Sequence, residues 1–313
     1  MLALGVAFIV LAPLLRWVVT PRLEKTPFDP IDPSIAEARN VLQYDVTQNR
    51  QTVVPLVRAT RTVVPDVKAS TDDVIVLDES LCTVRVVGPT PACVAANDPR
   101  LLSVTTDRVA SDRHTAEAVN EPQFKETVDG KPTAHVGLSY KFPFNTEKTT
   151  YQFFDTVVKK AYPMRYQREE DIQGLTTYVF VQQIPTTPVD LVPGLNVPGT
   201  YANTRTVWIE PRTGIIIKGQ EAQRRLFSQG NLAGKPALLG TLTFTDATIN
   251  GNVQTAQDGI DKLNLIGTTT QIILLVLGIG FVVVGLVLLL GGRHEPPAPA
   301  RHAEPAPEPV GAR

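Results

Sequence analysis

Carboxylates are side chains that could act in catalysis, and this sequence has thirty-one of them. Hydrolysis of a glycosidic bond needs two carboxyl groups facing each other across a cleft, and the central part of the chain supplies many. The run Glu169-Glu170-Asp171 is typical of a solvated turn, and Glu210 flanks a turn. Glu221 is a further candidate, but no spacing places any two of these groups across a cleft. The sequence therefore assigns no catalytic residue.

Histidines and nucleotide-binding motifs give no other chemistry. The four histidines, His114, His135, His294 and His302, stand alone, and no His-Glu-x-x-His occurs. A zinc site needs three or four clustered ligands, so surface or hydrogen-bonded histidines are the better interpretation. No Gly-x-x-x-x-Gly-Lys-Ser/Thr or Gly-x-Ser-x-Gly motif is present. We expect no metal, no cofactor and no enzymatic activity.

The two cysteines, Cys82 and Cys93, are expected to form a disulfide. Ten residues separate them, which is not the Cys-x-x-Cys spacing of a redox centre. A bridge across this loop would contribute roughly 2–3 kcal/mol by restricting the unfolded chain. Two free thiols in a cytosolic domain are the alternative, so the pair also bears on the compartment.

Two other clusters allow a binding role. The Arg224-Arg225 pair would suit a phosphate or an acidic lipid headgroup, although two exposed strand residues are the preferred interpretation. Tyr151-Gln152-Phe153-Phe154 is the densest aromatic stretch, and rings bury large apolar areas. We expect this stretch to be a core anchor rather than a ligand-stacking site.

These residues must be positioned by a chain that is held in a membrane. Ile272 to Leu290 is a run of nineteen residues without charge. As a helix it would extend roughly 28 Å, close to the hydrocarbon thickness of a bilayer. The run is apolar on all sides, which a core helix of a soluble protein is not. We predict a membrane-spanning helix over residues 271–292.

A second apolar segment opens the chain. Leu2 to Leu15 is followed by Arg16 and Trp17 without a small-x-small cleavage site. This favours an uncleaved anchor over residues 1–19, with a cleaved signal peptide as the alternative. Two spans would place both termini in the cytoplasm and the central part outside the inner membrane. The cysteine pair favours that orientation.

The sequence pattern of the central part predicts β-strands. Branched residues alternate with polar ones from Val41 onward, prolines punctuate the runs, and Pro211-Arg212-Thr213-Gly214 is typical of a type I turn. The polar stretch from Asn97 to Glu126 is expected to be a loop or solvated face, and Asn250 to cap a helix running from about Val253 to Leu265. We predict a mainly β (α+β) fold, an antiparallel β-meander outside the cytoplasm flanked by N- and C-terminal transmembrane helices. The expected segments are an anchor (1–19), a Pro-rich stalk (20–40), the β domain (41–250), a juxtamembrane helix (251–270), the span (271–292) and a disordered cytoplasmic tail (293–313).

The hairpin Trp208-Ile209-Glu210-Pro211-Arg212-Thr213-Gly214, with Lys141–Lys148 and Gly174–Phe180, resembles the actinobacterial envelope proteins of the PorA porin family. The resemblance implies an anchored inner-membrane protein with an extracytoplasmic domain and a part in envelope assembly, including maturation of mannose-containing lipoglycans. It brings no catalytic residues. A stop-transfer helix would hold the chain before the outer membrane, so our hypothesis is that the monomer forms no pore.

These observations lead to one expected function and two alternatives. Thirty basic residues nearly balance thirty-one acidic ones, which gives no field for nucleic acid. We expect a non-enzymatic protein whose partners are the lipid bilayer and envelope glycolipids or envelope-assembly membrane proteins, which it binds or scaffolds. The alternatives are an envelope glycan hydrolase or transferase using carboxylates not yet placed, and a porin-like channel component.

Overall fold

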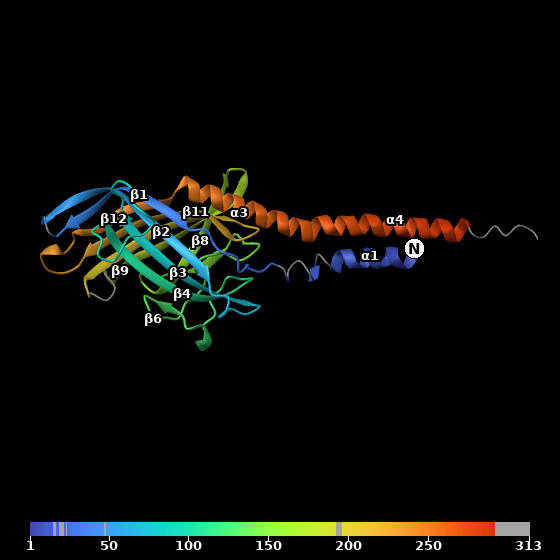
Figure 1. Cartoon of the computed structure of the whole chain (residues 1–313), viewed down its shortest axis with the longest axis horizontal. Coiled ribbons are helices and arrows are strands. Elements are labelled where there is room, and N and C mark those ends of the chain that lie inside the picture. Colours follow the sequence, from blue (N-terminus) through green and yellow to red (C-terminus); the bar gives the residue numbers. More distant parts are fainter. Residues whose placement is uncertain (15–16, 19–21, 23, 47, 192–195, 292–313) are drawn as a thin grey trace, which may run out of the picture. The chain divides into compact units, whose positions relative to one another are not determined.

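The computed structural model describes the chain except for residues 15–16, 19–21, 23, 47, 192–195 and 292–313 (Figure 1). The expected disordered tail therefore lies outside the described residues. The chain divides into two compact units, which are considered separately. A helical unit comprises Met1–Pro21 and Leu265–Arg313, and a sheet unit comprises Arg22–Asn264.

Two helices pack side by side in the helical unit. Helix α1 spans Leu2–Leu14, and α4 spans Thr270–Gly291 after the π-helical turn η4 at Leu265–Thr269. The backbones approach closely where both helices carry glycine: a Cβ on Gly5 would lie 2.7 Å from the Gly278 carbonyl oxygen. Small residues permit this approach, which is typical of helix pairs in lipid.

One helix of the described chain is long and apolar enough to cross a membrane. The helical stretch that contains α4 runs to Leu290, and most of its apolar side chains are exposed to the surroundings. Helix α1 has 13 residues, so it extends about 20 Å and falls short of a bilayer core. The expectation of two spans is therefore not supported by the described residues.

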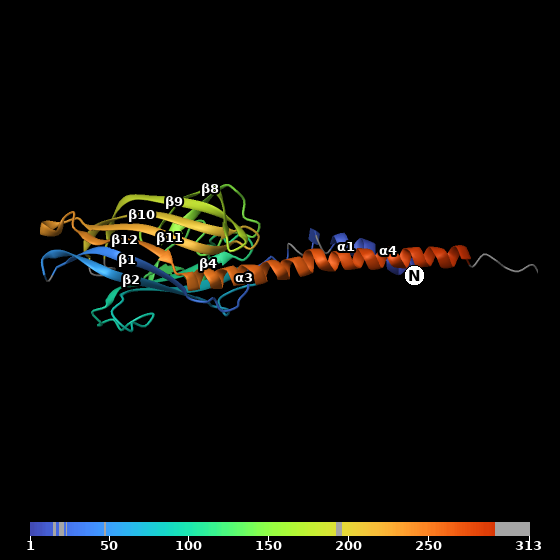
Figure 2. The ribbon, with the colours of Figure 1, turned by 90° about the horizontal axis from the view of Figure 1, so that it is seen from above.

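Twelve strands form one antiparallel sheet in the sheet unit (Figure 2). Its order is β6-β5-β4-β3-β2-β1-β12-β11-β10-β9-β8-β7, so nearly every strand pairs with its neighbour in sequence and β1 pairs with β12. The predicted antiparallel, mainly β fold is confirmed. The strands are β1 Ser34–Asp45, β2 Arg50–Pro65, β3 Val74–Arg85, β4 Leu101–Asp112, β5 Thr127–Val128, β6 Lys131–Pro132, β7 Thr150–Asp155, β8 Lys160–Ile172, β9 Leu175–Asp190, β10 Pro198–Glu210, β11 Ile215–Phe227 and β12 Pro236–Phe244.

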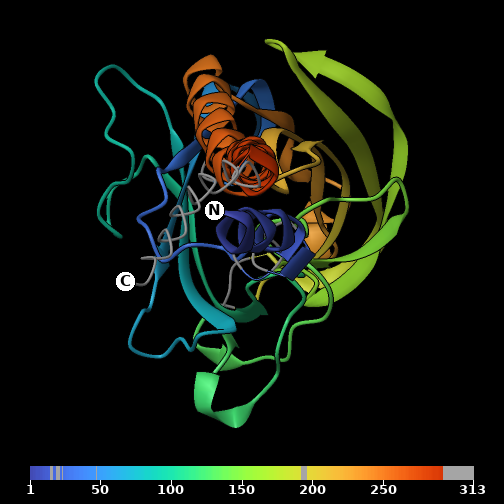
Figure 3. The ribbon, with the colours of Figure 1, turned by 90° about the vertical axis from the view of Figure 1, so that its right-hand side faces the viewer.

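The sheet rolls up without closing. Strands β2–β4 and β8–β10 lie on opposite sides of the rolled ribbon (Figure 3). The two edge strands, β6 and β7, do not pair with each other. Instead an irregular segment bridges the gap: Ala118 N donates to the Gly137 carbonyl, Leu138 N to that of Gln152, and Phe154 N to that of Leu138. This segment satisfies backbone groups that an open edge would leave exposed.

Apolar clusters occupy much of the interior of the roll. One is built on Leu138, Phe142, Phe153 and Phe180, and the predicted role of the aromatic stretch as a core anchor is confirmed for Phe153, which is 5% exposed. Two smaller clusters contain Ala38, Val41, Val54 and Val57, and Val63, Ile75, Leu77 and Val109.

Three expected boundaries differ from the structure. Ser34–Asp45 is strand β1, so the extended stalk ends well before residue 40. Leu101–Asp112 is the long strand β4 rather than a loop, and its alternation is hidden in the sequence because the inward residues Ser103 and Thr105 are polar and line a cavity. Helix α3 spans Asp246–Asn264, and Thr245 lies at its start, accepting from Thr248 N at 3.3 Å. Asn250 is therefore inside the helix rather than at its cap.

Helix α3 covers part of the sheet. Its apolar residues Ile249, Val253 and Ala256 pack with Ile217 of β11, and Asn252 donates to the carbonyl of Ile216 at 3.0 Å. This contact fixes the end of β11 next to the β10–β11 turn. Short 3-10 turns η2 (Pro122–Phe124) and η3 (Gly230–Leu232) complete the unit.

Candidate functional site

A cavity of about 120 Å³ lies inside the rolled sheet. Side chains from β1–β4, β7 and β10–β12 line it, so both halves of the roll contribute. One part of the wall is apolar and one is charged. The apolar part includes Leu238, Leu242 and Phe244 of β12, and the charged part consists of Arg61, Glu79, Arg205, Glu221 and Arg225.

Arg205 is the centre of one group of buried charges. Its Nε lies 2.9 Å from Glu221 Oε1, its Nη2 lies 3.0 Å from Asp155 Oδ2, and its Nη1 donates to Gln182 at 2.8 Å. Burial alone would raise the pKa of Glu221, but the charges of Arg205 and Arg61 lower it to about 2. Glu221 therefore stays a carboxylate at every physiological pH.

Arg61 organises a second group across the cavity. Its Nε lies 2.7 Å from Glu79 Oε1, and the Tyr140 hydroxyl lies 2.6 Å from Glu79 Oε2. Burial lowers the pKa of Arg61, but the charges of Glu79, Tyr140 and Glu221 outweigh it, so the pKa is raised. Because Glu221 and Arg205 also act on Arg61, the two groups form one electrostatic unit, which we call the charged belt (Arg61, Glu79, Arg205, Glu221).

The charged belt continues into the bridging segment through His135. Tyr140 also contacts Asp107, whose Oδ1 lies 2.8 Å from His135 Nε2, and His135 Nδ1 lies 3.3 Å from Glu126. Burial lowers the pKa of His135, but the two carboxylates raise it to about 9. His135 is fully buried and ion-paired, as expected for a histidine whose ring nitrogens are hydrogen-bonded within the protein.

The structure separates the two arginines that the sequence places together. Arg224 is exposed, and its Nη2 donates to Thr186 Oγ1 at 3.0 Å. Arg225 lines the cavity, its Cζ lies 5.4 Å from the centroid of the Tyr201 ring, and its Nε is buried without a hydrogen-bond partner. The expected exposed-strand interpretation is right for Arg224 only, because alternate residues of a strand point to opposite faces.

The Trp-x-Glu-Pro-x-Thr-Gly hairpin lies outside the cavity. Glu210 is 4% exposed and accepts hydrogen bonds from Arg212 N, Thr213 N and Thr213 Oγ1 at 2.6–2.8 Å. Gly214 has φ +74°, and Thr146 N donates to the Pro211 carbonyl at 2.7 Å. Trp208 is buried beneath the Lys218 ammonium, 4.3 Å from its Nζ. The motif is thus a turn whose backbone N–H groups are bound by its own Glu210, and it holds the segment before β7 through a backbone hydrogen bond.

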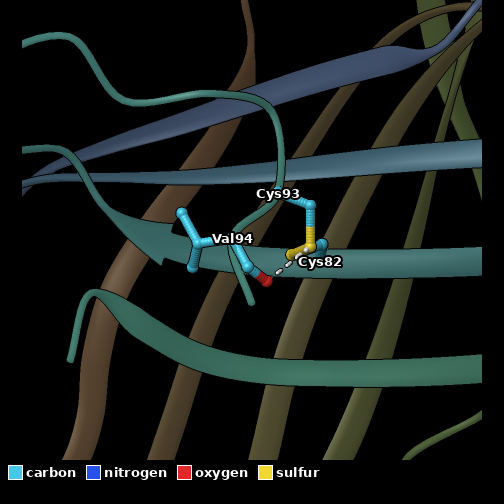
Figure 4. The surroundings of a disulfide bond; sticks show 3 residues. All are labelled: Cys82, Cys93 and Val94. Atoms are coloured by element: carbon cyan, nitrogen blue, oxygen red, sulfur yellow. Dashed lines mark hydrogen bonds between the residues drawn. A yellow bond between two sulfur atoms is a disulfide. The ribbon is translucent and has the colours of Figure 1, made fainter. Parts of the chain in front are cut away.

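The disulfide joins Cys82 of β3 to Cys93 (Figure 4). Cys82 is 3% exposed, and its neighbours Leu81 and Thr83 line the cavity, so Cys82 points to the outer face of the sheet. The bond therefore fastens the loop after β3 to the outside of the roll.

The other candidate residues do not meet in one place. Glu169 pairs with Lys148 at 2.6 Å, Glu170 with Arg168 at 2.6 Å, and Asp171 accepts from Gly174 N, all near the β8–β9 hairpin. His114 lies in the turn after β4, where its N–H donates to Asp112. His294 and His302 are outside the described residues. Within the described chain, no three His, Cys, Asp or Glu residues gather as a metal site.

The sequence reasoning missed most of the charged belt. Arg61, Glu79 and Arg205 lie within strands β2, β3 and β10, and no motif in the sequence marks them as functional. The available signal was a charged residue in the middle of a run of branched residues, as in Thr60-Arg61-Thr62 within β2. A charge there must find a partner if its strand is buried. Which partner it finds depends on the rolling of the sheet.

Comparisons with known proteins complete the description of the chain. A family model described as Porin PorA matches residues 1–287. Porin PorA of Corynebacterium amycolatum is 23% identical over 377 aligned residues, which cover 91% of this chain and 96% of the relative. Porin PorA of Corynebacterium resistens (strain DSM 45100 / JCM 12819 / GTC 2026 / SICGH 158) is 24% identical over 283 residues, which cover 62% of this chain and 68% of the relative.

Proposed function

Because the chain belongs to the Porin PorA family, we propose that this porin-like envelope protein takes small polar solutes into the charged cavity of its sheet unit. The family match includes the whole sheet and most of α4. Porins pass hydrophilic solutes through polar interiors. A polar, charged interior is the feature that this sheet has in common with them.

The observation that carries the proposal is the charged belt. Removing a charge from water costs several kcal/mol unless partners compensate it, and well-packed apolar residues would often be more stabilising. Here the four residues of the charged belt line a single cavity together with Arg225. Such an arrangement offers a polar solute both donors and acceptors once water is displaced.

We propose that the strands of the monomer do not face lipid. Residues that alternate with the cavity-lining ones carry ion pairs: Arg58 lies 2.9 Å from Glu37, and Arg108 lies 2.7 Å from Asp78. Strands of a membrane barrel present an apolar band outward instead. On this proposal α4 contacts the bilayer, the sheet lies in water, and the monomer alone forms no pore.

Binding or scaffolding of envelope glycolipids, the function expected first, has no support in the comparisons, whose names fit the porin-like alternative better. The same names do not support an inner-membrane location, because a porin acts in the outer layer of the envelope. We propose further that the protein is not an enzyme, since Glu79 and Glu221 are both held by guanidinium groups. We propose that the bilayer is the partner of α4 and that the protein associates with envelope-assembly membrane proteins. We propose no nucleic-acid partner.

Reconstitution of the full chain tests this function. We expect purified protein in liposomes to release small polar solutes, and in planar bilayers to show conductance that rises more steeply than linearly with protein density. Arg205→Lys and Arg205→Gln should alter solute selectivity. Arg168→Gln, at an exposed ion pair with Glu170, is the matched control and should not. Absence of solute release at any protein density, or identical selectivity in all variants, would overturn the proposal.

A further inference from the structure

We infer that the cavity binds a monocarboxylate with an apolar body, and that Arg225 holds its carboxylate. This inference rests on the proposed function, because it names the class of solute for the same cavity. It follows from the position of one cation and from the wall next to it.

Arg225 is the cavity arginine without a carboxylate partner. Arg61 pairs with Glu79, and Arg205 pairs with Glu221 and Asp155. Among the ion pairs of the described residues, none includes Arg225. Arg225 is half-buried as a residue, its Nε is shielded from solvent without a hydrogen bond, and its described ring contact is Tyr201. A half-buried cation with unused donors is a site for an anion.

The position of Arg225 in the sheet places it beside an apolar wall. Arg225 is directly opposite Leu238 in the β11–β12 ladder, and Glu221 is opposite Leu242. Leu238 and Leu242 both line the cavity and are only half-buried. Leu242 is four positions along β12 from Leu238, so the wall extends for about 14 Å from the position opposite Arg225. Both side chains pack against the cluster of Ala38, Val41, Val54 and Val57, and an apolar chain lying in the cavity would cover the part of them that still lines it.

The chemistry of the cavity selects among ligand classes. An inorganic anion would satisfy Arg225 but would leave the β12 wall uncovered. A cation with an apolar chain would meet Arg225 as a like charge, and the cavity glutamates are already paired with arginines. A carboxylate matches a guanidinium with two parallel hydrogen bonds, and its aliphatic body matches the wall. The two features together favour an aliphatic monocarboxylate.

Calorimetric titration of the full chain in lipid nanodiscs tests the inference, with octanoate as the probe and empty nanodiscs subtracted. We expect octanoate to bind wild type and R224Q alike, and R225Q to bind it about 10- to 100-fold more weakly. R225K, which keeps the charge, should retain most of the affinity, and Leu242→Ser should weaken octanoate but not acetate. Acetate, inorganic phosphate and octylamine should each bind wild type at least about tenfold more weakly than octanoate.

Three results would overturn the inference: equal octanoate affinity in wild type and R225Q, an equal loss in R224Q and R225Q, or acetate or phosphate binding as tightly as octanoate. Thermal unfolding of each variant identifies those that fail to fold. If R225Q does not fold, the octanoate affinities of R225K and Leu242→Ser test the inference in its place. Failure here is separable from failure of the proposed function. Solute release with selectivity set by Arg205 can stand without octanoate binding, and octanoate binding can stand without solute release.

Discussion

The carbonyl oxygen of Phe142 lies where a side chain on Gly214 would begin: a Cβ there would be 2.1 Å from it. Phe142 N also donates to the Gly214 carbonyl at 2.9 Å. The last residue of the Trp-x-Glu-Pro-x-Thr-Gly motif is thus a glycine both because its φ is +74° and because a neighbouring backbone occupies the space. The motif that points to the family therefore has a structural role: it packs the β10–β11 turn against the backbone of Phe142.

Gly214→Ala should destabilise the sheet unit beyond the cost of its conformation. A non-glycine residue at positive φ costs about 1–2 kcal/mol, and here the Phe142 backbone must also move. Gly174→Ala is the matched control, since Gly174 has φ +84° and no atom within 4 Å of a Cβ. Urea unfolding should give a clearly larger loss for Gly214→Ala. Equal losses would show that the Phe142 contact contributes nothing.

Reduction of the Cys82–Cys93 bond should lower stability while leaving the sheet intact. The bond closes a loop with a sequence separation of 11, which corresponds to about 3 kcal/mol of lost unfolded-state entropy. Because the loop lies on the outer face, the cavity should keep its shape. Unfolding with and without reductant measures the change. A double Cys82→Ala, Cys93→Ser variant should match the reduced protein and should not respond to reductant.

The strands could be predicted where one face of the strand is apolar. Thr241-Leu242-Thr243-Phe244 of β12 alternates, and the sequence places it correctly. Strand β4 could not be found in this way, because Ser103 and Thr105 face the polar cavity and the alternation disappears. A charged interior thus removes the periodic signal from the strands that build it.

The charged belt could not be predicted because its pairs are distant in sequence. Arg61 and Glu221 come from β2 and β11, and they interact only after the sheet has rolled. The turn could be predicted from the sequence, because Pro211 fixes its own φ and Gly214 permits a positive φ. Local conformational rules therefore identified the hairpin, whereas the candidate site depends on register and curvature.

His135 should make stability fall as the pH rises above neutral. Its folded-state pKa of about 9 exceeds the ordinary 6.5, so its ion pairs with Asp107 and Glu126 stabilise fully below pH 6.5 and are lost between pH 6.5 and 9. The free energy of unfolding should drop by up to about 3 kcal/mol over this range. His135→Gln should remove the drop, whereas His114→Gln should retain it. An unchanged pH profile in His135→Gln would contradict this assignment.

Arg205→Met should leave Glu221 and Asp155 as buried charges without their main partner. Loss of one member of a buried ion pair costs about 3–5 kcal/mol at neutral pH. In the wild type the pKa of Glu221 is about 2, below the ordinary 4.5, so its stabilising contribution is present above pH 4.5 and is lost as the pH falls towards 2. The variant should instead gain stability between pH 7 and 4.5, because the buried Glu221 carboxylate, without its main partner, protonates in this range. Urea unfolding at pH 7 and pH 4.5 should show this gain in Arg205→Met, and a clearly smaller change in wild type and in the control Arg168→Met.

A charge in the middle of α4 should release the protein from the membrane. Val283 is 53% exposed on a helix that is apolar on all sides, so in a bilayer Val283→Arg would place a guanidinium in hydrocarbon at a cost of about 2.5–3.5 kcal/mol. Gln271→Arg, at the start of α4, should cost much less because the side chain can reach the interface. Membrane flotation should therefore find a large soluble fraction for Val283→Arg and little for Gln271→Arg. Equal membrane retention of both variants would mean that α4 does not cross the hydrocarbon core.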